Sequence, residues 1–201
     1  MSFRIEEKII VNKFNLNNLK KYLSDLKVKT LYPSRKVMSL YFENSKYDAY
    51  NESAQGISPR SKIRIRHYPE TNSKIRLLEY KINSPEGRYK KSYKITASEE
   101  KKYQQQGIFD KKYGQCMPII YVTYDRDYLM FNKVRITIDT NIKYKQFYSN
   151  YISEDEFCCA EFKCNFNYDK DLLLKQFPFS KFRFSKYARG IEALLKSRVN
   201  F

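Results

Sequence analysis

The sequence predicts an α+β fold, a single domain over residues 1–201 that is mainly an antiparallel, closed β-barrel of about eight strands with peripheral helices. The first observation is a period of two, typical of β-strands, at Lys62, Arg64 and Arg66, which alternate with bulky neighbours. The second is that hairpin turns join many such segments, which favours closure into a barrel. The third is that the alternation recurs at Arg4, Glu6 and Lys8, at Glu79 and Lys81, at Arg135, Thr137 and Asp139, and at Glu161 and Lys163.

Eight segments have the length and the β-branched and aromatic content of strands, and turn residues separate them. The Ser-Pro-Glu-Gly turn at 84–87 predicts a hairpin between the strands before and after it. Strands are expected at residues 3–11, 36–43, 60–68, 75–82, 88–95, 117–126, 133–140 and 158–166, with 142–148 as an extension.

Leucines at helical spacing follow Asn15, which predicts an amphipathic helix with Asn15 as its N-cap. Thr96 or Ser98 is expected to cap a second, short helix. Helices are therefore expected after Asn15, over 98–106, over 169–177 and over 186–198, and connections at 45–59, with one helical turn, at 107–115 and at 149–156.

The composition is strongly basic. Lys and Arg number 39 against 22 acidic residues, a formal net charge of +17, which favours nucleic acid, an anionic membrane surface or a phosphate-rich molecule as partner. No run of about 18 apolar residues is present, so no membrane span is expected. The N-terminus lacks the apolar segment of a signal peptide, and a cytoplasmic protein is expected.

The cysteines and the single histidine do not indicate a metal or redox site. Cys116, Cys158, Cys159 and Cys164 lack a paired C-x-x-C spacing, and His67 is the only histidine. Cys158 and Cys164 share a strand face with apolar residues and are expected to be buried. His67 is expected in the core or at its boundary.

If helices cover the apolar strand faces, the charged faces must line the lumen of the barrel. Desolvating unpaired charges costs several kcal/mol each, so such a lumen must be wet and its charges matched by a ligand. A lumen rich in Arg and Lys with a few carboxylates implies a polyanion together with a divalent cation, Mg²⁺ or Mn²⁺.

Short motifs follow one another in a specific order along nearly the whole chain. They are RxExK at 4–8, SLYFEN at 39–44, KIRIRHY at 62–68, EYK at 79–81, YDR at 124–126, RITID at 135–139, EFK at 161–163 and FSKYARGI at 184–191. In this order they resemble the VTC domain, the catalytic domain of the polyphosphate polymerase of the vacuolar transporter chaperone complex, which has short bacterial relatives. That family belongs to the triphosphate tunnel metalloenzymes, alongside the CYTH-type triphosphatases.

The resemblance implies a role for each matching residue. Tunnel cations that grip phosphates in catalysis are Lys8, Arg64, Arg66, Lys81, Arg126, Arg135 and Lys186. Substrate-binding residues are Arg4, Tyr41, Lys62, Lys90, Lys163 and Ser185. Glu161 is the principal ligand of Mn²⁺ or Mg²⁺, with Glu6 and Glu79 as further ligands. The residue types agree, since Arg forks hold phosphate oxygens bidentately and a carboxylate places a divalent ion beside phosphate.

Two positions depart from the patterns of the superfamily. The CYTH-type triphosphatases begin with ExExK, and Arg4 stands in place of their first Glu, which removes a carboxylate and favours the VTC side. In the later hairpin strand VTC domains usually have Lys-x-Arg, where this chain has Lys90 followed by Ser92. Lys91 and Lys94 are candidates to compensate.

The function expected from the resemblance is a metal-dependent polyphosphate polymerase that transfers the γ-phosphoryl group of ATP to phosphate or a growing polyphosphate chain. The alternatives are a triphosphatase that hydrolyses tripolyphosphate or nucleoside triphosphates, and a non-catalytic polyphosphate-binding module. Nucleic acid is not expected to be the main partner, because most aromatic residues share strand faces with Ile and Leu. The sequence leaves open whether a separate membrane-bound protein is a partner.

Several residues have a simpler alternative role. Glu79 is equally suited to a structural ion pair. Asp139 either binds metal or caps the turn at Thr140 and Asn141. The basic residues at 60–68 have a solvated strand face as their alternative.

Overall fold

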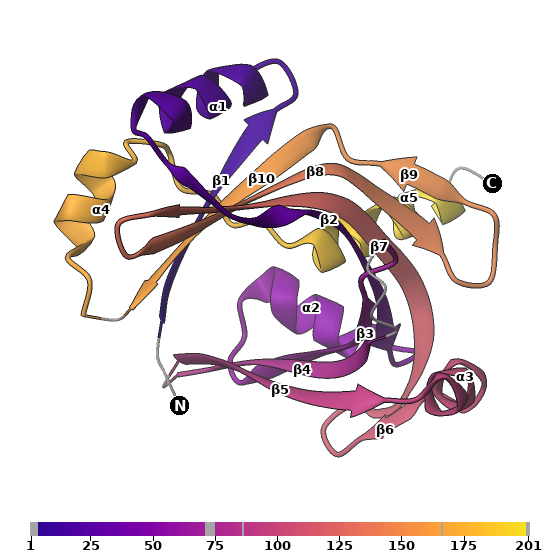
Figure 1. The fold of residues 1–201 in the computed structure, drawn as a ribbon. Helices are drawn as coiled ribbons and strands as arrows, with labels where there is room; N and C mark the ends of the chain where they lie inside the picture. Colours follow the sequence, from indigo (N-terminus) through magenta and orange to yellow (C-terminus); the bar gives the residue numbers. More distant parts are fainter. Residues whose placement is uncertain (1–3, 71–74, 86, 166, 200–201) are drawn as a thin grey trace. The chain divides into compact units, whose positions relative to one another are not determined.

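The computed structural model describes residues 4–70, 75–85, 87–165 and 167–199. The predicted α+β class is confirmed, because eight of the strands found in these residues follow one another in a mainly antiparallel sheet and helices accompany them (Figure 1). The hydrogen-bonded order is β1-β10-β8-β7-β2-β3-β4-β5, with β6 on β7 and β9 on β8.

Most elements lie where the sequence pattern places them, but β2 and β7 are longer than expected, and the short strands β6 and β9 lie in segments expected to be connections. The strands are β1 (Arg4–Asn12), β2 (Lys29–Glu43), β3 (Arg60–His67), β4 (Arg76–Ser84), β5 (Gly87–Ile95), β6 (Ile108–Asp110), β7 (Gly114–Phe131), β8 (Val134–Gln146), β9 (Ile152–Glu154) and β10 (Phe157–Asn165). The helices are α1 (Leu16–Asp25), α2 (Asp48–Gln55), α3 (Ala97–Gln106), α4 (Lys170–Gln176) and α5 (Lys186–Val199).

The chain forms two compact units, and the long strands β2, β7 and β8 contribute residues to both. The prediction of one domain over 1–201 stays a prediction. The first unit comprises Met1–Arg35, Tyr124–Ile142 and Asp155–Phe184. The second unit comprises Lys36–Thr123, Lys143–Glu154 and Ser185–Phe201.

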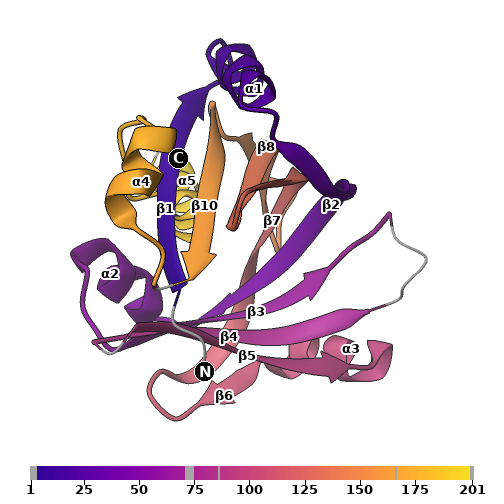
Figure 2. The same cartoon turned by 60° about the vertical axis from the view of Figure 1, so that its left-hand side comes forward.

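In the first unit, β10 pairs antiparallel with both β1 and β8, and β1 and β10 lie side by side in both views (Figures 1 and 2). Because side chains along these strands alternate between the two sides of the sheet, one face of the sheet packs into an apolar core against α1 and α4. Ile136, Ala160, Phe162 and Leu19 are each at most 3% exposed there. Cys158 and Cys164 lie buried in the same core, as predicted. The opposite face is left for the charged side chains.

In the second unit, β3 pairs with β2 and β4, and β4 pairs with β5, all antiparallel. The predicted hairpin at the Ser-Pro-Glu-Gly turn is therefore confirmed. Leu40, Phe42, Ile63 and Ile65 are at most 2% exposed and form the centre of its core. Burying such side chains stabilises a fold by about 1.5–3 kcal/mol each. His67 lies at the boundary of this core, as expected, and contacts Glu100.

The differences from the prediction have local causes. β2, which lies beside β7 in the sheet, begins at Lys29, seven residues before the expected start at 36, because its first part does not alternate in the way that predicts a strand. The segment 45–59 forms a helix of eight residues, α2, where one turn was expected. Thr96 caps α3 through a capping box, as predicted, whereas the side chain of Asn15 makes no cap hydrogen bond.

Candidate functional site

The first unit presents one charged strand face, which we call the first charged face. Cross-strand pairing brings its members together, since Lys8 pairs with Glu161 and Glu161 with Thr137, while Lys163 pairs with Arg135. Side chains that alternate in this way point to one side of a sheet. The first charged face consists of Glu6, Lys8, Arg126, Arg135, Thr137, Asp139, Glu161 and Lys163.

Glu161 lies between two ammonium groups. Its Oε1 is 3.9 Å from Nζ of Lys8 and 3.3 Å from Nζ of Lys163, and its side chain is 7% exposed. Nζ of Lys8 also donates to the carbonyl of Phe184 over 3.0 Å. Nζ of Lys163 donates to Oε1 of Glu6 over 3.0 Å. One lysine therefore joins the carboxylates of Glu6 and Glu161.

This pair of carboxylates is the part of the face that fits a divalent ion. Mg²⁺ is usually bound through one or two carboxylates, substrate phosphates and water. Within the described ranges, no group of three or more His, Cys, Asp or Glu side chains could hold an ion alone. Glu161 and Glu6 therefore fit a Mn²⁺ or Mg²⁺ ion whose remaining ligands come from a phosphate substrate and water.

Asp139 and Arg126 form a bidentate pair. Nε and Nη2 of Arg126 lie 2.6 and 2.7 Å from the two carboxylate oxygens of Asp139, which is 1% exposed at its side chain. Burial alone would lower the pKa of Arg126, but the Asp139 carboxylate raises it well above its usual value. Asp139 thereby orients Arg126, and its two alternative roles, metal binding and a turn cap, stay predictions.

Two buried polar atoms of β8 have no hydrogen-bond partner in the described part of the chain. They are Nε of Arg135 and Oγ1 of Thr137, two residues apart on the first charged face. A buried donor left without a partner costs about 1–3 kcal/mol. Such atoms are explained by an oxygen-bearing ligand or water that occupies the space before them. Thr137 was not among the predicted site residues, although its place between Arg135 and Asp139 in the RITID motif carried the signal.

The second unit presents a more strongly basic strand face, which we call the second charged face. Cross-strand pairs align Tyr41 with Arg64 and Arg64 with Glu79, while Lys81 pairs with both Lys62 and Lys90. Its cations outnumber its carboxylates, which suits a polyanion. The second charged face consists of Tyr41, Lys62, Arg64, Arg66, Glu79, Lys81, Lys90 and Ser92.

Glu79 is enclosed by donors. Nε and Nη2 of Arg64 lie 2.7 and 2.5 Å from its Oε2, and Nζ of Lys90 lies 2.6 Å from its Oε1. Oγ of Ser92 adds a donor at 3.3 Å, and Nε of Arg66 lies 3.9 Å away. Burial alone would raise the pKa of Glu79, but Arg64, Arg66 and Lys90 lower it to about 2. These contacts favour the ion-pair alternative over metal binding.

Tyr41 and the start of α5 complete the surroundings of this face. Nη1 of Arg64 donates to the hydroxyl of Tyr41 over 3.0 Å. Burial alone would raise the pKa of Tyr41, but Arg64, Arg66 and Lys186 lower it. Nζ of Lys62 donates to Oγ of Ser185 over 2.9 Å. The predicted residues Lys62, Ser185 and Lys186 therefore lie with Tyr41 in one region.

Strand register shows on which face of β5 the candidates Lys91 and Lys94 lie. Arg4 lies in β1, but its side chain falls outside the described residues. Lys94 is an even number of residues from Lys90 and shares its face, whereas Lys91 pairs with Tyr80 on the opposite face. Only Lys94 can therefore compensate for Ser92 on the second charged face.

Glu43 is a buried carboxylate that the sequence reasoning did not single out, although it follows Ser39 and Tyr41 in the alternation of SLYFEN. It accepts hydrogen bonds from the backbone N–H groups of Asn44, Ala49 and Tyr50 over 3.0 to 3.2 Å. Tyr187 donates its hydroxyl to the same carboxylate. Glu43 thereby holds the N-terminus of α2 and a tyrosine of α5.

We expect Glu43 to make stability fall as pH rises. Burial raises its pKa from 4.5 to about 7, although the backbone N–H groups oppose the shift. The folded state therefore keeps a proton that the unfolded chain releases, so this stability is full below pH 4.5 and is lost as pH rises through about 7. Urea unfolding between pH 4.5 and about 7 measures this effect: the free energy of unfolding of the wild type should fall by at most about 3 kcal/mol relative to that of Glu43→Gln. Parallel pH profiles of the two proteins would contradict the shift.

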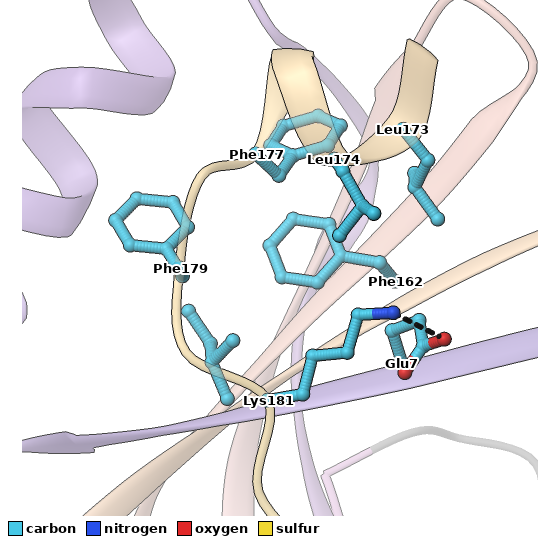
Figure 3. A pocket seen from close by; sticks show the side chains of 8 residues that line it. Glu7, Phe162, Leu173, Leu174, Phe177, Phe179 and Lys181 are labelled. Carbon is cyan, nitrogen blue, oxygen red and sulfur yellow. Dashed lines mark hydrogen bonds and ion pairs between the residues drawn. The ribbon is translucent and has the colours of Figure 1, made fainter. Parts of the chain in front are cut away.

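An apolar pocket lies on the other face of β1 and β10 (Figure 3). Phe162, Phe177 and Phe179 are among the side chains that line it, and Nζ of Lys181 lies 2.9 Å from Oε1 of Glu7 at its rim. Its lining contains no cluster of cations that could bind phosphate. It belongs to the core of the first unit rather than to the candidate site.

No helix in the described ranges is both long and apolar enough to cross a membrane.

Comparison with protein families places the whole candidate site within one match. The family model described as VTC domain matches residues 3–195. No curated protein matches the chain.

Solved structures show the same fold at low sequence identity. A candidate adenylate cyclase from Bacillus halodurans is 16% identical, with 92% of this chain and 94% of that chain covered and a TM-score of 0.60. A candidate adenylyl cyclase from Hippeastrum, described as having a dominant triphosphatase activity, is 13% identical over 96% of each chain, with a TM-score of 0.58. A conserved hypothetical protein from Pyrococcus furiosus is 12% identical over 92% of this chain and 99% of its own, with a TM-score of 0.58. These matches confirm the predicted triphosphate tunnel (CYTH-like) fold.

Proposed function

The chain belongs to the VTC domain family, and from this membership we propose that it is a metal-dependent polyphosphate polymerase that transfers the γ-phosphoryl group of ATP to a growing polyphosphate chain. The observation that carries the proposal is the pair of buried donors on β8, Nε of Arg135 and Oγ1 of Thr137. They lie on the face that also holds Glu161, Lys8 and Lys163. Two donors, two ammonium groups and a carboxylate are the complement of a phosphate group and a divalent ion.

Phosphoryl transfer requires little covalent chemistry from a protein. It requires in-line positioning of the two oxygens and neutralisation of the charge on the transferring group. Arg135 and Thr137 would donate to phosphate oxygens, and Lys8 would add positive charge. Arg126, already oriented by Asp139, would present its remaining N–H groups without further ordering. These roles come from the first charged face.

The second charged face supports the binding of a long polyanion. Arg64 and Arg66 are 5% and 8% exposed and are held by Glu79, Tyr41 and Ser39. A guanidinium fixed in this way loses little freedom when it binds a phosphate. Lys62, Lys81, Lys90 and Lys186 would supply the further substrate contacts that the resemblance assigns to them.

Glu161 and Glu6 would hold a divalent ion, which would supply neutralisation of the negative charge on the transferring group. These two carboxylates are the ligands that this chain supplies to the ion. Lys163 contacts both carboxylates when no ion is bound. Mn²⁺ and Mg²⁺ are the ions proposed.

The test is incubation with ATP and Mn²⁺ or Mg²⁺, followed by gel analysis for polyphosphate and an assay for free phosphate. Polyphosphate chains that lengthen with time are the expected result. Free phosphate without chain growth would replace the proposal with its second candidate, a triphosphatase, which the activity described for the Hippeastrum protein favours. Saturable binding of tripolyphosphate without either product would leave a binding module, and stronger, steeply salt-dependent binding of RNA would indicate a nucleic-acid partner.

A further inference from the structure

A cluster of two tyrosines and an arginine in the first unit has no role in the proposed chemistry. The guanidinium of Arg35 lies 5.6 Å from the ring centre of Tyr32 and 5.7 Å from that of Tyr128. The two rings meet edge to face, with centres 5.8 Å apart. Tyr128 is 8% exposed, but Tyr32 is 47% exposed. The cluster is therefore anchored on one side and open to solvent on the other.

The cluster lies on the same strand face as Arg126. Tyr128 follows Arg126 by two residues in β7, a separation of about 6.8 Å along a strand. Leu129, on the other face, packs into the core of the first unit. Oγ of Ser34 donates to the carbonyl of Arg126 over 3.3 Å, which ties the segment that carries Tyr32 to this part of β7.

Strand register places the cluster beside the buried donors of β8. A two-residue turn after Phe131 joins β7 to its neighbour β8, so the two strands run antiparallel. A step from Arg126 to Tyr128 therefore corresponds to a step from Asp139 toward Thr137. Tyr128 of the cluster and Thr137, which carries one of the proposed phosphate-binding atoms, therefore lie on the same face of two neighbouring strands.

Arg35 differs from the arginines that carboxylates hold. Among the described residues it makes no ion pair with Asp or Glu, and its contacts are the two tyrosine rings. Arginine planes and aromatic rings are the surfaces on which nucleobases stack, whatever the base. A guanidinium supported by rings adds a plane that can stack on a base and a charge that attracts a nucleotide.

We propose that Tyr32, Arg35 and Tyr128 form a subsite for the base of the nucleotide whose phosphates bind the first charged face. This inference rests on the proposed function and adds a means of selecting a nucleoside triphosphate over an unsubstituted polyphosphate. Tyr32 is the residue whose ring is open for stacking.

The experiment compares two ligands by calorimetric titration, with metal chelated so that neither is turned over. They are the β,γ-imido analogue of ATP and tripolyphosphate. Tyr32→Ala should weaken binding of the nucleotide about tenfold, since loss of base stacking has an effect of this order. Binding of tripolyphosphate should change by less than about twofold, because the phosphate contacts remain. Arg35→Ala should act in the same direction.

Matched variants separate stacking from general damage. Tyr32→Phe keeps the ring and should bind both ligands as the wild type does. Tyr148→Ala removes another tyrosine, 65% exposed, and should have no effect. If Tyr32→Ala and Arg35→Ala weaken the binding of both ligands equally, or leave nucleotide binding unchanged, the subsite is overturned while the phosphate site stands. Failure of the unmodified protein to bind tripolyphosphate at all would instead overturn the proposed function.

Discussion

Glu161→Gln should reduce the metal-dependent turnover of ATP at least about 100-fold, since loss of one group that stabilises transition-state charge has this effect. Its carboxylate is 7% exposed and lies with Glu6 around Lys163, where the divalent ion is proposed to bind. The amide keeps the shape of the side chain but binds a divalent ion poorly. The variant should still bind tripolyphosphate without metal, because Lys8 and Lys163 lose a competing anion. Product formation from ATP and calorimetry with tripolyphosphate measure the two effects separately.

Glu7→Gln is the matched control for this prediction. Glu7 directly follows Glu6 in β1. It pairs with Phe162 and points to the face opposite to Glu6, at the rim of the apolar pocket (Figure 3). Its ion pair with Lys181 is partly exposed and worth about 0–1 kcal/mol. Turnover should therefore be unchanged. Wild-type turnover in Glu161→Gln, with the same metal dependence, would refute the role of Glu161.

The alternation of charge along the strands predicted much of the fold and the presence of charged strand faces opposite the apolar ones. This succeeded because the side-chain period of a strand is two, so a strand with one apolar face fixes which residues share the other face. Lys8, Glu161 and Arg135 therefore lie together as expected, although they come from three distant segments. Local pattern also predicted α3, whose capping box lies within four residues of sequence.

The partners of individual charges could not be predicted in the same way. Which of several cations holds Glu79, or that both oxygens of Asp139 bind Arg126, depends on register and rotamer rather than on period. The helix α2 was underestimated for a related reason. Its N-terminal N–H groups are satisfied by Glu43 from the preceding strand, a contact that no helical pattern encodes.

Glu79→Gln should lower the free energy of unfolding by about 3–5 kcal/mol, the range found when one partner of a buried ion pair is removed. The carboxylate is 1% exposed, and Arg64, Arg66 and Lys90 surround it. The amide leaves these cations close together without a compensating charge. Urea unfolding at neutral pH measures the loss. Ser92→Ala is the matched control, because it removes one hydrogen bond to the same carboxylate and should cost only about 1 kcal/mol.

Acid provides an independent check on the same residue. The neighbouring cations lower the pKa of Glu79 from 4.5 to about 2 against the opposing effect of burial, so its contribution to stability is present above pH 4.5 and is lost as pH falls through about 2. The gap in stability between wild type and Glu79→Gln should therefore narrow as the pH falls below 4.5. Equal or greater stability of Glu79→Gln at neutral pH would contradict a stabilising ion pair. If Glu79 were a metal ligand instead, its replacement would weaken the binding of Mn²⁺ or Mg²⁺, which calorimetric titration with the metal alone measures.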